Sequence, residues 1–325
     1  MSPQDSGFSW SNLAILAHVP GVTTSQPTPV FDNLTGTLHV AFNSGGAGIA
    51  QRLIMSSTDD GLNFGQPEPL TCTGGRCCAR GRITANIGLG RGLVVKTGGG
   101  QRLILPSENA PLYSDDSGKT WQCGNFPSNR ESVGENSIAR CTGEACGGQG
   151  GFAMVMRESM TPLGHPTVSV AFSANAVDWG NATLVTSLTQ FSNYSQAPGL
   201  AAVDGGLLLA HGGGPGNGVT GPGTNARRAR HGDSGGADLL FSRDGLQWRL
   251  LKRLWPMTGG YCTLEELEVD SHGAATKFGV LFEGGVAVEQ PNRPHARFMN
   301  FTWPFKKKGN TASQSSTSLC LMRPS

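Results

Sequence analysis

One turn pattern recurs along the chain and constrains the fold more than any other feature. Residues 57–64 (STDDGLNF) and 114–121 (SDDSGKTW) both read Ser-x-Asp-x-Gly-x-x-aromatic. Residues 173–179 (SANAVDW) and 242–248 (SRDGLQW) are versions shortened by one residue. Each copy follows an apolar run rich in residues that favour strands. The pattern therefore indicates one structural unit repeated several times, which is the signature of a repeat architecture.

The chemistry of the repeated residues explains the turn. Ser and Asp side chains bond to turn amides, and Gly accepts a positive φ, while the aromatic ring packs beneath the turn. The first serines stand at positions 57, 114, 173 and 242. A period of roughly 50–60 residues built from several short strands is typical of the blades of a β-propeller. The 48 glycines agree with many strands joined by tight turns.

Composition limits the classes of partner. The net charge of +2 does not favour nucleic acid as a partner. No apolar run is long and uninterrupted enough to span a bilayer, because His18 and Pro20 break the stretch at 13–22. The same stretch lacks the preceding Lys or Arg of a signal peptide. We expect a monomer with no membrane span.

The eight cysteines fit disulfides better than a metal site. No Cys-x-x-Cys pair occurs, so we predict neither a structural metal nor a cofactor. Four disulfides allow 105 connectivities, and the sequence does not choose among them. Four glycosylation sequons occur, at Asn33, Asn181, Asn193 and Asn300, and they favour a secretory, lysosomal or extracellular protein. The lack of a signal peptide argues against this localisation, so localisation stays open.

The repeat resembles the Asp-box of the sialidase superfamily, a motif that some other propellers also carry. Residues 27–32 (PTPVFD) with 35–42 resemble the "N-P-T-P-V-V-D…T-G-x-I" signature of the second blade, and residues 83–106 resemble the run before the next Asp-box. The resemblance implies an all-β fold, a six-bladed sialidase-like β-propeller with an incomplete first blade. We expect the propeller over residues 1–305 and a disordered tail over 306–325, which begins with three lysines.

The resemblance also implies a reaction. Sialic acid carries a carboxylate on its anomeric carbon, which arginines with bidentate donors can hold. The same charge repels a carboxylate nucleophile, and sialidases use tyrosine instead. Tyr261, in 259–264 (GGYCTL), resembles that nucleophile. The other two tyrosines, Tyr113 and Tyr194, lie in a repeat strand and in a sequon.

Further residues match the family in spaced pairs. Glu135, in 134–137 (GENS), resembles the base that activates the tyrosine, with Glu131 as the competing choice. Arg157, 22 residues later at the end of 152–157 (FAMVMR), resembles the second arginine of a substrate-binding triad. Glu283, which ends 278–283 (FGVLFE), resembles the glutamate that orients the first arginine.

The third arginine of the triad is expected about 30 residues before Tyr261. The run 226–230 (ARRAR) falls there, within a Gly/Pro-rich insertion. Arg230 is our first choice and Arg228 the second. An exposed basic loop or a dibasic cleavage site is an equal reading of the same run.

One departure from the family decides the functional expectation. The first arginine and the acid/base aspartate of the family precede the signature at 27–32, yet this chain has no Lys or Arg before Arg52. Either the chain is shortened at its start or the protein has lost catalysis. The matches at Tyr261, Glu135 and Glu283 favour an exo-α-sialidase that removes terminal sialic acids from glycoconjugates by a retaining mechanism, and this is our prediction. The alternative is a catalytically impaired Asp-box propeller acting as a glycan-binding or scaffold module.

Overall fold

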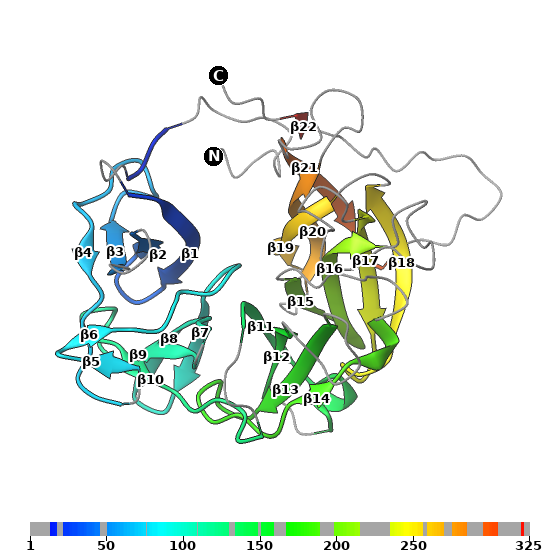
Figure 1. Cartoon of the computed structure of the whole chain (residues 1–325), viewed down its shortest axis with the longest axis horizontal. Helices are drawn as coiled ribbons and strands as arrows, with labels where there is room; N and C mark the ends of the chain where they lie inside the picture. The colour runs from blue at the N-terminus through cyan, green and yellow to red at the C-terminus, as the bar shows by residue number, and fades with distance from the viewer. Residues whose placement is uncertain are drawn as a thin grey trace, which may run out of the picture.

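The described part of the chain is all-β, and it forms five four-stranded sheets arranged around a central axis (Figure 1). The structure is a computed structural model. It describes residues 14–17, 22–45, 51–75, 77–108, 110–129, 134–148, 151–158, 167–188, 198–214, 235–255, 259–269, 275–284, 295–304 and 320–321. In every sheet, strands that are neighbours in sequence pair antiparallel, so each sheet is a meander. Repeated radially, such meanders make a β-propeller.

The strands of the first three sheets follow in sequence order. The first sheet contains β1 (Thr24–Asp32), β2 (Thr37–Ser44), β3 (Gln51–Ser57) and β4 (Glu68–Pro69). The second contains β7 (Leu93–Thr97), β8 (Gly100–Leu105), β9 (Leu112–Ser114) and β10 (Gln122–Cys123). The third contains β11 (Asn136–Cys141), β12 (Gly151–Glu158), β13 (Thr167–Ser173) and β14 (Thr183–Leu184).

The last two sheets have longer strands. The fourth contains β15 (Gly199–Val203), β16 (Gly206–Gly214), β17 (Gly235–Ser242) and β18 (Trp248–Trp255). The fifth contains β19 (Gly259–Val269), β20 (Ala275–Gly284), β21 (His295–Thr302) and β22 (Cys320–Leu321). A small hairpin of β5 (Cys78–Ala79) and β6 (Arg82–Ile83) precedes the second sheet, and two 3₁₀ turns occur, η1 (Gly143–Cys146) and η2 (Thr186–Leu188).

The expected β-propeller is therefore present, but the expectation of six blades is wrong for the described chain, which has five. The reason lies at the start. The incomplete first blade is expected before the second-blade signature at 27–32, and the residues described ahead of β1, 14–17 and 22–23, form no strand. The described sheets begin instead with β1, in the segment matched to the family's second blade. Of the expected tail 306–325, residues Cys320–Leu321 pair with β21 and the rest lies outside the described residues.

The four repeat turns occupy equivalent places. Each joins the third strand of its sheet to the fourth, between β3 and β4, β9 and β10, β13 and β14, and β17 and β18. In the turn after Ser114, Gly118 N donates to Ser114 Oγ (2.9 Å) and Thr120 N donates to Asp116 Oδ1 (2.9 Å). Since the first strand of each sheet lies nearest the axis, these turns lie at the outer rim (Figure 1).

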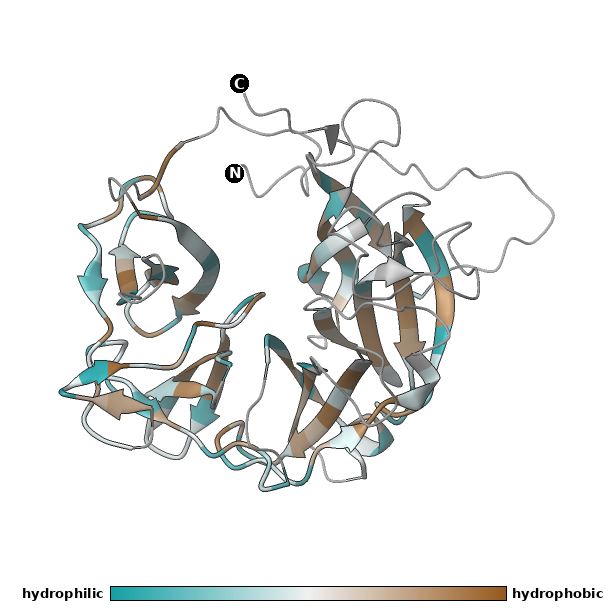
Figure 2. Cartoon of the chain, in the orientation of Figure 1, coloured by the Kyte–Doolittle hydropathy of each residue, from teal (hydrophilic) through white to brown (hydrophobic). Residues whose placement is uncertain are grey.

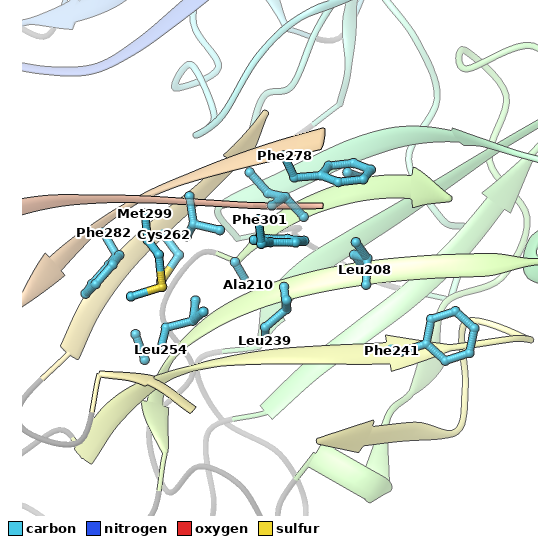
Figure 3. Packing of buried hydrophobic residues seen from close by; sticks show 14 of the residues in the cluster. Leu208, Ala210, Leu239, Phe241, Leu254, Cys262, Phe278, Phe282, Met299 and Phe301 are labelled. Carbon is cyan, nitrogen blue, oxygen red and sulfur yellow. The ribbon is translucent and has the colours of Figure 1, made fainter. Parts of the chain in front are cut away.

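Apolar side chains fill the spaces between neighbouring sheets, and the strands are correspondingly hydrophobic (Figure 2). One such core joins the fourth and fifth sheets, where Leu208, Leu239, Phe278 and Phe282 are buried (Figure 3). Trp121 belongs to the core between the first and second sheets. Trp248 belongs to the core between the third and fourth sheets. Burial of apolar side chains between sheets is the dominant favourable contribution to the fold. The first strand of each sheet lies nearest the axis (Figure 1).

Three disulfides settle part of the pairing that the sequence left open. Cys72 bonds Cys78, Cys77 bonds Cys123, and Cys141 bonds Cys146. Cys262 is a free, buried thiol. No helix in the described ranges is long and apolar enough to cross a membrane.

Candidate active site

Tyr261, Glu135 and Arg157 converge from three different strands or strand ends. Tyr261 lies on β19 in the fifth sheet, Glu135 immediately precedes β11, and Arg157 lies near the end of β12 in the third sheet. Both β11 and β19 are first strands, so both lie towards the axis, with β15 between them (Figure 1). Residues far apart in sequence are thus brought together by the radial arrangement of the sheets.

The contacts among these three side chains are short. The Tyr261 hydroxyl donates to Glu135 Oε1 at 3.0 Å. Arg157 Nη1 donates to Glu135 Oε2 at 2.7 Å, and it lies 3.4 Å from the Tyr261 hydroxyl. The side chains of Glu135 and Arg157 are 12% and 24% exposed, so the ion pair is largely desolvated. A desolvated, charge-assisted contact of this kind holds both partners in a fixed geometry.

The environment keeps the tyrosine protonated. Burial, followed by the negative charge of Glu135, raises the pKa of Tyr261 to about 12, although the charge of Arg157 acts in the opposite direction. Burial alone would lower the pKa of Arg157, but the hydrogen bond and charge of Glu135 outweigh it and raise that pKa. The phenol is therefore neutral at physiological pH and needs a base in order to act as a nucleophile. Glu135 accepts the hydrogen bond from the Tyr261 hydroxyl, and its carboxylate is therefore in reach of the phenolic proton as a base.

Two close approaches between backbone segments position Glu135, Arg157 and Tyr261. A Cβ on Gly134 would lie 2.5 Å from the carbonyl oxygen of Arg157, so only glycine lets the chain before β11 pass this close to β12. Arg157 N also donates to the carbonyl of Glu135 at 2.8 Å. A Cβ on Gly212 of β16 would lie 1.7 Å from the carbonyl oxygen of Gly260, next to Tyr261. Glycine at these two positions therefore sets two spacings, that of the start of β11 from β12 and that of β16 from β19.

Glu283 lies at the same end of the fifth sheet as Tyr261. Cys262 pairs with Phe282, and both point into the core shared with the fourth sheet. Because side chains alternate along a strand, Glu283 lies on the face opposite Phe282, whereas the pairing shifts register between Gly259 and Cys262, so alternation does not fix the face of Tyr261. Of the other predicted site residues, Arg228, Arg230 and the alternative base Glu131 lie outside the described residues.

Sequence reasoning missed a polar group on the other side of Glu135. Gln26 Nε2 donates to Glu135 Oε1 at 3.2 Å and lies 3.5 Å from Glu108 Oε1. Asn43 donates to Gln26 Oε1, and Asn86 donates to Glu108 Oε2. Only their position beside the matched segments could have drawn attention to these residues, since each is an ordinary polar residue in sequence.

A separate cavity of about 270 Å³ lies at the outer rim between the first and second sheets. Its lining includes Ser56, Glu68, Lys119 and Trp121, and none of the residues around Tyr261 contributes to it. Its lining contains no tyrosine–glutamate pair.

Comparison with solved structures identifies the fold. A Hadza microbial sialidase matches with a TM-score of 0.59 at 18% identity, covering 86% of this chain and 55% of that one, so this chain spans little more than half its length. The intramolecular trans-sialidase from Ruminococcus gnavus, solved with oseltamivir carboxylate, matches with a TM-score of 0.54 at 12% identity over 86% of this chain and 76% of that one. A protein of unknown function from Dyadobacter fermentans gives a TM-score of 0.52 at 16% identity, covering 84% and 75%.

No family model and no curated protein matches the sequence. The structural likenesses, all at low identity, define the architecture: the chain is a sialidase-like β-propeller. This is the fold of glycoside hydrolases, and what the site does on that fold must be argued from the site itself.

Proposed function

We propose that the protein is a retaining exo-α-sialidase in which Tyr261 is the nucleophile and Glu135 its general base. The observation that carries the proposal is the 3.0 Å hydrogen bond from a buried phenol to a carboxylate that is itself paired with an arginine. A phenol whose pKa is raised to about 12 is a poor nucleophile unless a base removes its proton as it attacks.

The proposed reaction consists of two displacements at the anomeric carbon. Glu135 takes the phenolic proton while the Tyr261 oxygen bonds to the anomeric carbon, and the bond from that carbon to the leaving oxygen breaks. The leaving group takes a proton from an acid outside this trio. Water then attacks the anomeric carbon and gives a proton to the conjugate base of that acid, the bond to Tyr261 breaks, and the proton on Glu135 returns to the phenolate. Two displacements at one carbon give retention.

Arg157 fits the role of a substrate contact. Its guanidinium is fixed beside the nucleophile and can hold the carboxylate of an acidic sugar. Glu283, at the same end of the fifth sheet as Tyr261, and Arg228 or Arg230 are the other residues that we propose for substrate binding. Tyrosine suits such a substrate because a neutral phenol avoids repulsion between two carboxylates.

A catalytically impaired, glycan-binding propeller is the second candidate. It is favoured by the ion pair of Arg157 with Glu135, because a sugar carboxylate must compete with a contact that is already formed. Such a protein would bind sialosides without turning them over.

The test is hydrolysis of an aryl α-sialoside, whose good leaving group lessens the need for an acid. We expect turnover by the wild type, a loss of at least about 100-fold in Tyr261→Phe and a similar loss in Glu135→Gln. Tyr113→Phe is the matched control, because Tyr113 bonds Gln122 within the second sheet. Binding of a sialoside without turnover by the wild type would support the second candidate and overturn the first.

A further inference from the structure

Gln26 makes a contact that the proposed reaction does not yet use. One amide nitrogen faces two carboxylates: Gln26 Nε2 is 3.2 Å from Glu135 Oε1 and 3.5 Å from Glu108 Oε1. An amide group carries two N–H donors, enough to serve both acceptors. The oxygen of Glu135 that Gln26 contacts is the one that accepts from Tyr261.

The backbone holds Gln26 in an unusual conformation. Its φ is +54°, in the left-handed region that residues other than glycine seldom adopt. It also lies where the pairing of β1 with β2 shifts register, between Ser25 and Thr28. Irregularities of this kind redirect a side chain out of the ordinary alternation of a strand. Here the side chain is redirected towards Glu135 and Glu108.

A chain of contacts fixes the amide from behind. Asn43 Nδ2 donates to Gln26 Oε1, which leaves the amide nitrogen facing the carboxylates. Asn43 is itself held by the backbone of Ile87, because Ile87 N donates to Asn43 Oδ1 at 3.0 Å and Asn43 Nδ2 lies 3.3 Å from Ile87 O. The orientation of Gln26 is thus determined by a buried neighbour and not by solvent.

Glu108 is fixed in a similar way. Asn86 donates to its Oε2, and its backbone N donates to the carbonyl of Asn86 at 2.9 Å. The guanidinium of Arg52 bonds the nearby carbonyls of Thr84 and Ala85, and the charge of Glu108 acts on it. The charged and titratable groups that these contacts place around Glu135 are therefore Arg157, Tyr261, Glu108 and, beyond Glu108, Arg52.

We infer that Gln26 is a positioning residue for the base, orienting Oε1 of Glu135 towards Tyr261, and that Glu108 tunes that base through the shared amide. The inference rests on the proposed function. Gln26 Nε2 is shared by Glu135 and Glu108, so replacing Gln26 removes a donor from Glu135, whereas replacing Glu108 removes a neighbouring negative charge. Gln26 and Glu108 thus act on Glu135 in opposite directions.

The test is the pH profile of kcat/KM for an aryl α-sialoside, whose acidic limb reports protonation of the base. Gln26→Met removes the donor and keeps the length of the side chain. We expect kcat to fall about tenfold with KM changed less than about twofold, and the acidic limb to move to higher pH. Glu108→Gln removes the charge, and we expect the acidic limb to move to lower pH.

Two further variants separate positioning from folding. Asn accepts a positive φ better than Gln does, but its side chain is one methylene shorter. We therefore expect Gln26→Asn to unfold at the wild-type temperature or above. Its pH profile of kcat/KM should still have the acidic limb at higher pH than in the wild type. Gln66→Met, at an exposed position, is the matched control and should behave as the wild type.

The outcomes are distinct. If the wild type and Gln26→Met share the same kcat and acidic limb, the inference is overturned while the proposed function stands. If both Gln26→Met and Glu108→Gln move the limb in one direction, the opposed roles are refuted. If the wild type does not hydrolyse the sialoside, the proposed function fails and the inference fails with it.

Discussion

The Tyr261 hydroxyl and the Glu135 carboxylate are joined by a 3.0 Å hydrogen bond although 126 residues separate them in sequence. Tyr261 comes from the fifth sheet and Glu135 from the edge of the third. The geometry of the pair therefore depends on how three sheets pack around the axis. Variants that shift the backbone near either residue should change activity before they change the fold.

Gly134→Ala tests this dependence. The new Cβ would lie 2.5 Å from the Arg157 carbonyl oxygen, so one of the two backbones must move. We expect the free energy of unfolding to fall by about 1–3 kcal/mol and turnover of an aryl sialoside to fall by about 100-fold through misplacement of Glu135. Gly98→Ala is the control, since nothing lies within 4 Å of its Cβ. Wild-type turnover by Gly134→Ala would show that the close approach does not position the base.

His211 should make the protein sensitive to mild acid. Complete burial lowers the pKa of His211 to about 4, below its ordinary value of 6.5. Above pH 6.5 the ring is neutral in both folded and unfolded chains. Between pH 6.5 and 4 only the unfolded chain takes up the proton, so stability is lost as pH falls, by on the order of 3 kcal/mol once the pH is below 4.

The measurement is urea unfolding of the wild type and of His211→Leu at pH 7.5 and pH 5. The difference in unfolding free energy between the two pH values should be smaller in the variant, even if the variant is less stable at both. An equal difference in the two proteins would show that His211 does not titrate on unfolding.

Asp116→Ala should weaken one repeat turn. Burial would raise the pKa of Asp116, but hydrogen bonds from Thr120 and Ser114 outweigh it and lower that pKa. The carboxylate accepts from both the amide and the hydroxyl of Thr120. We expect a loss of about 1–2 kcal/mol at neutral pH, shrinking as pH falls through the lowered pKa and the native carboxylate becomes protonated. Asp60→Asn, at an exposed position, serves as the control for thermal unfolding, and equal melting temperatures for all three proteins would contradict the role of Asp116.

Cys262 should be unreactive in the native protein despite standing next to Tyr261. Its thiol is fully buried, and burial raises its pKa above the ordinary range. Since the thiolate is the reactive form, iodoacetamide at pH 8 should label Cys262 only after denaturation. Peptide mass mapping before and after urea treatment checks this. Labelling of the native protein would mean that the core between the fourth and fifth sheets opens readily.

Much of the architecture was predictable because the repeat turns depend on local chemistry. Ser114, Asp116 and Gly118 form their turn through hydrogen bonds within a few residues, so the sequence alone reveals them. The number of sheets was not predictable in this way. Six were expected from family resemblance, and the described residues form five.

Some residues of the candidate site were predictable from the sequence and others were not. Tyr261, Glu135 and Arg157 stand in motifs that resemble those of a family, and the structure brings them together. Gln26 and Glu108 stand in no such motif, and their approach to Glu135 depends on a backbone irregularity in β1 and on contacts across the first two sheets. Long-range contacts of that kind leave no local pattern in the sequence.

Covalent trapping of the nucleophile tests the central claim most directly. A 3-fluorosialosyl fluoride forms a glycosyl–enzyme bond that hydrolyses slowly, so the modified residue can be identified by peptide mass mapping. We predict an adduct on Tyr261, formed about 10²–10⁴-fold more slowly in Glu135→Gln and absent from Tyr261→Phe. An adduct on a different residue, or turnover of sialosides by Tyr261→Phe at the wild-type rate, would contradict the account.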